Sequence, residues 1–149
     1  MTRYEIHVAS TVPVAFLAVA LGYHPTVALP LLLGALLPEL DARTESTHRS
    51  WALHTFLPPA LVYVLGRRLE AFSAVPALLT ATNFLALGMG LHFLADYVYP
   101  RRMTHEGAAW PVRPVGISAP WGLLWLGVSW TVQWFLYIVP EFAPWLVGL

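Results

Sequence analysis

Four long stretches without Asp, Glu, Lys or Arg dominate this sequence. They cover residues 6–38, 50–66, 71–95 and 114–140. A helix needs about 20 mostly apolar residues to cross the hydrocarbon core of a membrane, with a range of about 17 to 25. Each stretch is long enough for one crossing, and the first is long enough for a hairpin. None shows the alternation of barrel strands. The sequence therefore predicts an all-α integral membrane protein.

The composition excludes several other classes of protein. Of the 149 residues, 58% are hydrophobic and only 11% are charged, whereas a soluble domain has about 25% charged residues. The length predicts a single domain over residues 1–149. The formal net charge is zero, so we expect no nucleic-acid partner. There is no cysteine, which excludes disulfides, thiolate zinc sites and iron–sulfur clusters.

Turn-forming residues divide the chain into about five hydrophobic helices, of which the second is short. They are expected at residues 6–22, 25–37, 51–66, 71–99 and 118–139. The residues Tyr23, His24 and Pro25 predict a tight turn after the first helix, because proline breaks a helix interior but is tolerated at a helix start. We expect a kink at Pro58 and Pro59 in the third helix, and a short apolar tail after the fifth.

The arginines predict how this bundle is oriented in the membrane. Five crossings place six arginines on one side and two on the other. The larger group contains Arg3, Arg43, Arg49, Arg101, Arg102 and Arg113, and the smaller group contains Arg67 and Arg68. Short loops rich in arginine stay in the cytoplasm. The amino terminus is therefore expected in the cytoplasm. A re-entrant second helix would invert every later segment and remove the asymmetry.

On this topology, most histidines and several carboxylates gather at the cytoplasmic face. The group comprises His7, Glu39, Asp41, His48, His54, His92, Asp96, His105 and Glu106. His24 alone among the histidines falls on the other side. Ionisable groups at membrane depth are costly and are usually functional. We therefore interpret the cytoplasmic group as a functional site.

The residue types at this face favour a metal ion. His92 and Asp96 are four residues apart, so both lie on one helix face. Imidazoles and carboxylates without thiolate suit zinc, and also manganese or iron. A catalytic zinc keeps a position for water, and a further carboxylate, Glu39 or Glu106, is expected to accept a proton. Alternatively, His92 and Asp96 form a hydrogen-bonded pair that only fixes helix packing.

The loops beside these residues predict a substrate with an anionic headgroup. Arginine binds phosphate and carboxylate groups in a bidentate manner, and the expected binding residues are Arg49, Arg101, Arg102 and His105. A substrate that approaches from the cytoplasmic leaflet is expected to be a lipid or another amphiphile with an ester or phosphoester bond.

The motifs resemble those of a known family, the membrane-bound metal-dependent hydrolases, whose bacterial members include a LexA-regulated inner-membrane protein. The family has an early His, then Pro-Asp-x-Asp, Thr-His-Ser, His-x-x-x-Asp, Thr-x-x-Gly and Trp-Pro. The counterparts here are His7, Pro38-Glu39-Leu40-Asp41, His48-Arg49 with His54-Thr55, His92 to Asp96, Thr104 to Gly107, and Trp110-Pro111. The resemblance covers residues 7–111, with Glu39 in place of the first Asp and Thr55 in place of Ser.

The resemblance implies a helical protein of the prokaryotic inner membrane with a metal site at its inner surface. The implied metal ligands are His7, Asp41, His54, His92 and Asp96, with Glu39 and His48 nearby. The expected function is hydrolysis by a divalent metal centre, with zinc the first candidate.

Two other functions remain open. A non-catalytic accessory subunit of a larger membrane complex would suit a chain rich in proline and tryptophan, and protein partners or a homo-oligomer then become part of the prediction. Haem ligation by His54 and His92 is the other alternative, because haem ligands lie at matching depth on neighbouring helices.

Overall fold

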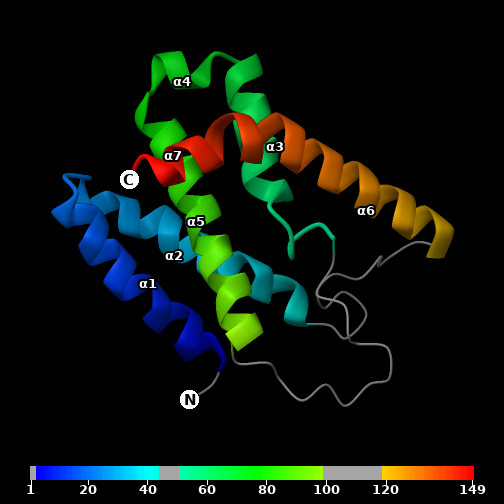
Figure 1. Ribbon diagram of the computed structural model, residues 1–149, viewed down its shortest axis with the longest axis horizontal. Coiled ribbons are helices and arrows are strands. Elements are labelled where there is room, and N and C mark those ends of the chain that lie inside the picture. The colour runs from blue at the N-terminus through cyan, green and yellow to red at the C-terminus, as the bar shows by residue number, and fades with distance from the viewer. Residues whose placement is uncertain (1–2, 44–50, 99–118) are drawn as a thin grey trace.

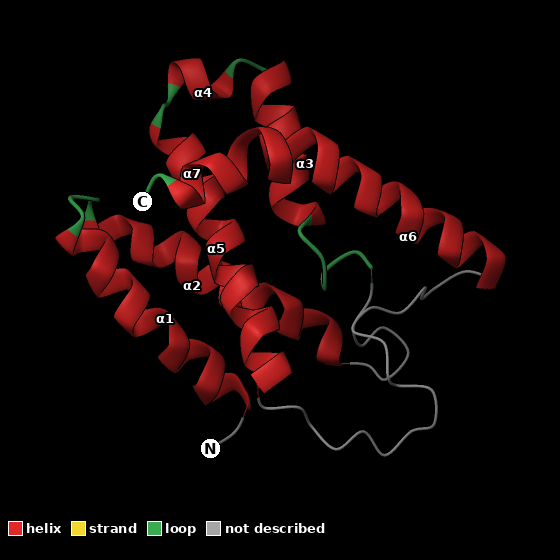
Figure 2. Ribbon diagram, viewed as in Figure 1, coloured by secondary structure: helices red, strands yellow, loops and turns green. Residues whose placement is uncertain are grey.

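A computed structural model describes residues 3–43, 51–98 and 119–149 of the protein. Every regular element in these ranges is helical (Figure 2), which confirms the predicted all-α class. The elements are α1 (Arg3–Ala20), η1 (Pro25–Val27), α2 (Ala28–Leu36), η2 (Leu37–Arg43), α3 (Leu57–Arg68), α4 (Ala71–Ala74), α5 (Ala77–Val98), α6 (Ala119–Gln133), η3 (Trp134–Phe142) and α7 (Ala143–Val147).

A hairpin of α1 and α2 forms one side of the molecule, and α5 crosses it (Figure 1). The hairpin turn lies where the sequence predicts it. Gly22 adopts a φ of 94°, a left-handed conformation that glycine adopts without steric cost. The side chain of His24 then accepts a hydrogen bond from the Thr26 backbone N–H, which caps η1. His24 is exposed and lies at the end of α1 opposite to His7.

The contact between α2 and α5 brings the two backbones together at a pair of glycines. A Cβ atom at Gly34 would overlap the carbonyl oxygen of Leu85, and one at Gly88 would overlap that of Leu31. Small residues permit such close approach in helical membrane proteins, where packing replaces the hydrophobic effect as the driving force. The two glycines therefore fix the distance at which α2 and α5 cross.

Proline residues move two helix boundaries from their predicted positions. The expected third helix over 51–66 is wrong at its start, because α3 begins only at Leu57, with proline in its first turn. Proline needs no partner for its missing N–H at that place, so Pro58 and Pro59 start the helix instead of kinking it. The expected fourth helix over 71–99 is interrupted before Pro76, where Val75 has a φ of −137°. The residue before a proline is disfavoured in the helical conformation.

The chain remains helical beyond the predicted end of the last helix at residue 139. α6 continues into the π-helix η3, which contains Pro140, and then into α7. A π-helix changes the hydrogen-bond ladder to wider turns, and here it carries the proline without ending the helix. The expected apolar tail is therefore a structured element. Phe142 from this segment lies in one of two buried hydrophobic clusters, and Trp145 packs against both.

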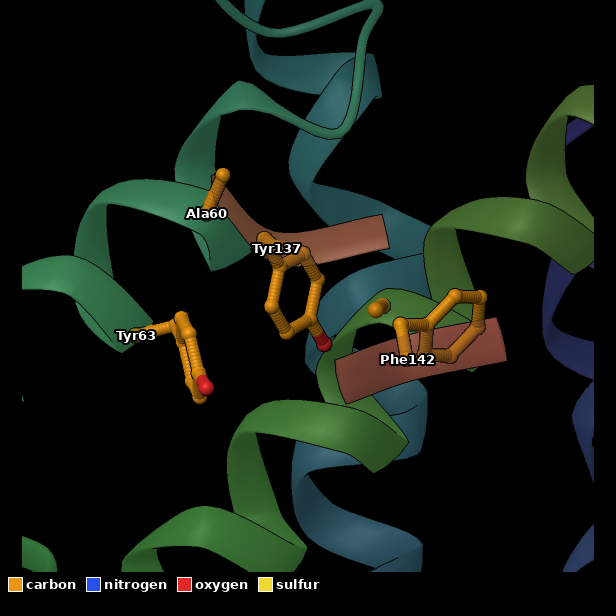
Figure 3. Close-up of a cluster of buried hydrophobic side chains, with 5 residues drawn as sticks. Ala60, Tyr63, Tyr137 and Phe142 are labelled. Atoms are coloured by element: carbon orange, nitrogen blue, oxygen red, sulfur yellow. The ribbon is translucent and has the colours of Figure 1, made fainter. Parts of the chain in front are cut away.

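The hydrophobic core consists of two buried clusters. One contains Ala60, Tyr63, Ala86, Tyr137 and Phe142, and Figure 3 shows Tyr137 between Tyr63 and Phe142. The other contains Ala18, Val27, Leu31 and Phe84. Trp145 contacts members of both clusters, with ring centroids 5.2 Å from Phe84 and 5.9 Å from Phe142. The end of the described chain therefore joins the two halves of the core.

A polar network crosses the first cluster. The Tyr137 hydroxyl donates a hydrogen bond of 2.9 Å to Asn83 Oδ1, and Asn83 Nδ2 donates one of 3.1 Å to Glu141 Oε1. We expect Tyr137→Phe to lower the free energy of unfolding by about 1 to 3 kcal/mol, because Asn83 Oδ1 loses a buried donor. Thermal unfolding followed by circular dichroism measures the change. Tyr4→Phe is the control, since Tyr4 is 56% exposed, and an equal effect of both substitutions would contradict the prediction.

One helical segment among the described residues is both long and apolar enough to cross a membrane, namely Ala77–Asp96. The segments Tyr4–Ala20 and Pro25–Leu40 are apolar but shorter. The all-α fold is thus established, and the five crossings and their orientation stay a prediction.

Candidate metal centre

Four separate parts of the chain bring histidines and carboxylates to one end of the helices. His7 lies in the first turns of α1, Glu39 in η2, His54 just before α3, and His92 and Asp96 in the last turns of α5. The helix ends that meet are those that the alternating topology predicts. His7 and His92 are each 1% exposed and His54 is 7% exposed. The imidazoles are therefore held inside the protein.

Asp96 lies at the centre of this group. Its carboxylate oxygens are 3.6 Å from His7 Nε2, 3.8 Å from His92 Nε2 and 3.9 Å from His54 Nε2. These distances exceed the usual 2.7 to 3.2 Å of a hydrogen bond. Around a tetrahedral zinc ion with bonds of about 2.1 Å, neighbouring ligand atoms lie about 3.4 Å apart. The distances to Asp96 are close to that value. The spacing is therefore closer to that of metal ligands than to that of hydrogen-bonded pairs.

The buried imidazoles have nitrogen atoms that lack hydrogen bonds. Both ring nitrogens of His7 and the Nε2 atom of His92 are buried and make no hydrogen bond of good geometry. A buried polar atom without a partner costs about 1 to 3 kcal/mol, so such atoms are rare unless a ligand satisfies them. One ligand atom each from His7, His92 and Asp96 lies within 4.8 Å of the others. These residues fit a divalent metal ion.

The three rings lie in contact with one another. His7 stacks on His92 with ring centroids 3.9 Å apart, and His54 meets His92 edge-on at 5.3 Å. Imidazole binds a metal ion in its neutral form. The contact of His54 with His92 leaves no space for a porphyrin between them, which argues against haem.

Glu39 lies at the more exposed side of the group. Its Oε1 atom is 3.2 Å from His7 Nε2, and its side chain is 30% exposed. The interaction with the His7 ring lowers the pKa of the Glu39 carboxyl below its ordinary value, and this effect exceeds the opposing effect of burial. Glu39 is therefore an ionised carboxylate at neutral pH, next to the imidazoles and within reach of solvent.

The structure brings together five of the residues selected from the sequence: His7, Glu39, His54, His92 and Asp96. Asp41 lies in η2 two residues after Glu39, but its side chain is outside the described part of the structure. The other selected residues also fall outside the described residues. These are His48, Arg49, Arg101, Arg102, His105 and Glu106.

Two supporting groups of the site were not predicted from the sequence. The backbone carbonyl of Ala35 lies 2.9 Å from His92 Nδ1, and no residue type signals a carbonyl that serves this purpose. The Thr55 hydroxyl donates to the Trp51 carbonyl and accepts from the Leu57 N–H, so it holds the turn that carries His54. A threonine shortly before a helix that starts with proline is the sequence signal that could have identified this second group.

Comparisons with known proteins identify no relative, so the site is described by its geometry. No protein-family model, no curated protein and no solved structure matches this chain.

Proposed function

We propose that this protein is a membrane-embedded hydrolase that uses one divalent metal ion, with zinc the first candidate and manganese or iron as alternatives. His7, His92 and Asp96 hold the ion, and His54 lies close enough to join them. The observation that carries the proposal is that buried imidazole nitrogens without a hydrogen bond of good geometry converge on Asp96, with Glu39 Oε1 3.2 Å from His7 Nε2. A purely structural role would have paired these nitrogens with hydrogen-bond partners.

The residues around the imidazoles supply the other needs of hydrolysis. When bound, the metal ion supplies a Lewis acid that polarises an ester or phosphoester and lowers the pKa of water. Glu39 is ionised and partly exposed, so it can accept a proton from water. Asp96 balances the charge and orients the imidazoles through its two oxygens. Hydrolysis is the reaction class for which this combination of groups is suited.

The distribution of polarity supports a location in the membrane, with the lipid bilayer as the surroundings. Besides its hydrophobic core, the protein buries several polar side chains, and many large apolar side chains face outward. The buried polar residues include His7, Thr11, Asn83, His92 and Gln133. The exposed apolar residues include Phe16, Leu29, Leu33, Trp130 and Phe135.

This surface also bears on the substrate. Phe16, Leu29 and Leu33 belong to α1 and α2, which carry or lead into the site, so a molecule dissolved in the bilayer reaches the site along them. We propose an amphiphile with an ester or phosphoester bond, cleaved at the cytoplasmic face of a prokaryotic inner membrane.

Elemental analysis of the purified protein tests the proposal. We expect about one transition-metal ion per chain after loading with Zn²⁺ and removal of excess ion, and a loss of that ion in His92→Ala. The matched control is His24→Ala, because His24 is an exposed histidine that bonds only within its own turn. The control should keep the metal content of the native protein. Undiminished metal in His92→Ala, or no bound metal in the native protein, would exclude the site.

A further inference from the structure

The hydrogen bond between His92 and Ala35 determines which nitrogen of His92 carries its hydrogen. His92 Nδ1 and the Ala35 carbonyl oxygen are 2.9 Å apart, and both residues are buried. A carbonyl oxygen can only accept, so Nδ1 must donate. In a neutral imidazole, Nε2 then has no hydrogen and presents its lone pair. Nε2 is also the atom that faces Asp96.

Pro38, three residues after Ala35, affects how many N–H groups compete for the Ala35 carbonyl. α2 ends at Leu36, and the chain tightens into the 3₁₀-helix η2, in which a carbonyl accepts from the N–H three residues ahead. Ala35 is close to the end of α2, so its carbonyl lies at the α-helical spacing from Glu39 and at the 3₁₀ spacing from Pro38, which has no N–H. Pro38 is also among the fully buried side chains. Pro38 therefore removes one of the two N–H groups that could compete for the Ala35 carbonyl, and this carbonyl lies in hydrogen-bond range of His92.

The glycine contact places this carbonyl against the ring. Gly34 directly precedes Ala35, and Gly88 lies one helical turn before His92. Because α2 and α5 touch backbone to backbone at these glycines, the Ala35 carbonyl reaches a side chain of α5 directly. A wider crossing would move the carbonyl out of hydrogen-bond range.

We infer that Ala35, through its carbonyl, and Pro38 are positioning residues that hold His92 in the Nδ1–H tautomer and direct its Nε2 toward the metal site. The inference rests on the proposed function, because the tautomer matters only if His92 binds a metal. The tautomer itself exists without metal. Ligating histidines are commonly oriented by such a partner on the second nitrogen. Here the partner is the backbone carbonyl oxygen of Ala35, for which Pro38 offers no competing N–H.

The experiment measures the tautomer in metal-free protein. The native chain, labelled with ¹⁵N-histidine, is studied by NMR at about pH 8, where histidine is neutral. The His92 signals are assigned by their loss in His92→Gln. We expect a protonated Nδ1 and an unprotonated Nε2 in the native protein. A protonated Nε2 at His92 would overturn the inference, and the tautomer itself is measured in the native protein.

A proline variant tests whether Pro38 contributes to the choice of tautomer at His92. Pro38→Ala restores an N–H that competes for the Ala35 carbonyl, so we expect a mixture of the two tautomers and a Zn²⁺ affinity about 10- to 100-fold lower. Pro30→Ala, which changes a proline in the first turn of the preceding helix α2, should change neither. An unchanged tautomer and affinity in folded Pro38→Ala would overturn the role of Pro38. The native tautomer without Zn²⁺ binding would instead remove the proposed function, so the two failures are distinguishable.

Discussion

Gly88→Val is expected to prevent the native crossing of α2 and α5. The Cβ atom of the new side chain would overlap the Leu31 carbonyl oxygen and lie 2.9 Å from the Ala35 nitrogen. Both are backbone atoms of a helix, so they cannot turn aside as a flexible side chain would. We expect a loss of at least about 4 kcal/mol, a large part of the usual 5 to 15 kcal/mol of a folded domain. Thermal unfolding and size-exclusion chromatography in detergent measure the effect.

The matched control is Gly127→Val in α6, where an added Cβ meets no atom within 4 Å. This control introduces the same side chain into a helix and should leave the unfolding temperature nearly unchanged. Gly34→Val should behave like Gly88→Val, because its Cβ would overlap the Leu85 carbonyl oxygen. A folded Gly88→Val with the thermal stability of the control would show that the two backbones do not touch.

Asp96→Asn is expected to cause the largest loss of metal binding among single substitutions. Asp96 is the one described carboxylate close to all three imidazoles, and the amide removes its charge while keeping its shape. If one ligand supplies about 3 kcal/mol of the total for a structural zinc site, the dissociation constant for Zn²⁺ should rise by at least about 100-fold. Titration of the metal-free protein with Zn²⁺, followed by calorimetry, gives this constant.

The control for Asp96→Asn is Glu70→Gln, which neutralises an exposed carboxylate just before α4. It should bind Zn²⁺ with the native affinity. The unfolding temperature of both variants without metal separates a lost ligand from a damaged fold. Equal Zn²⁺ affinities for Asp96→Asn and the native protein would contradict the assignment of Asp96 as a ligand.

The meeting of His7, Glu39, His54, His92 and Asp96 could be predicted from the sequence because of a simple topological rule. Uncharged stretches of helical length alternate in direction, so the start of one helix lies beside the end of the next. The spacing of His92 and Asp96 placed both on one helix face without knowledge of the packing. Residue type and order were therefore sufficient for the approximate site.

Other features depend on contacts that residue types do not reveal. Proline at 58 and 59 is compatible with a kink or with a helix start, and only the packing of α3 decides between them. Hydropathy marks residues 142–149 as apolar but does not show that Trp145 contacts Tyr23 and Phe84. The Ala35 carbonyl has no side-chain signature, so its bond to His92 could not be predicted.

The position of η3 and α7 has a consequence for the order in which the protein assembles during translation. The ribosome synthesises α1, α2, α3 and α5 before Tyr137, Phe142 and Trp145, which pack in the two hydrophobic clusters. Among the described residues, the imidazoles and carboxylates at the opposite end come from residues 7–96. The growing chain can therefore bring its metal-binding side chains together at one end before the aromatic residues that complete the hydrophobic core at the other end are synthesised.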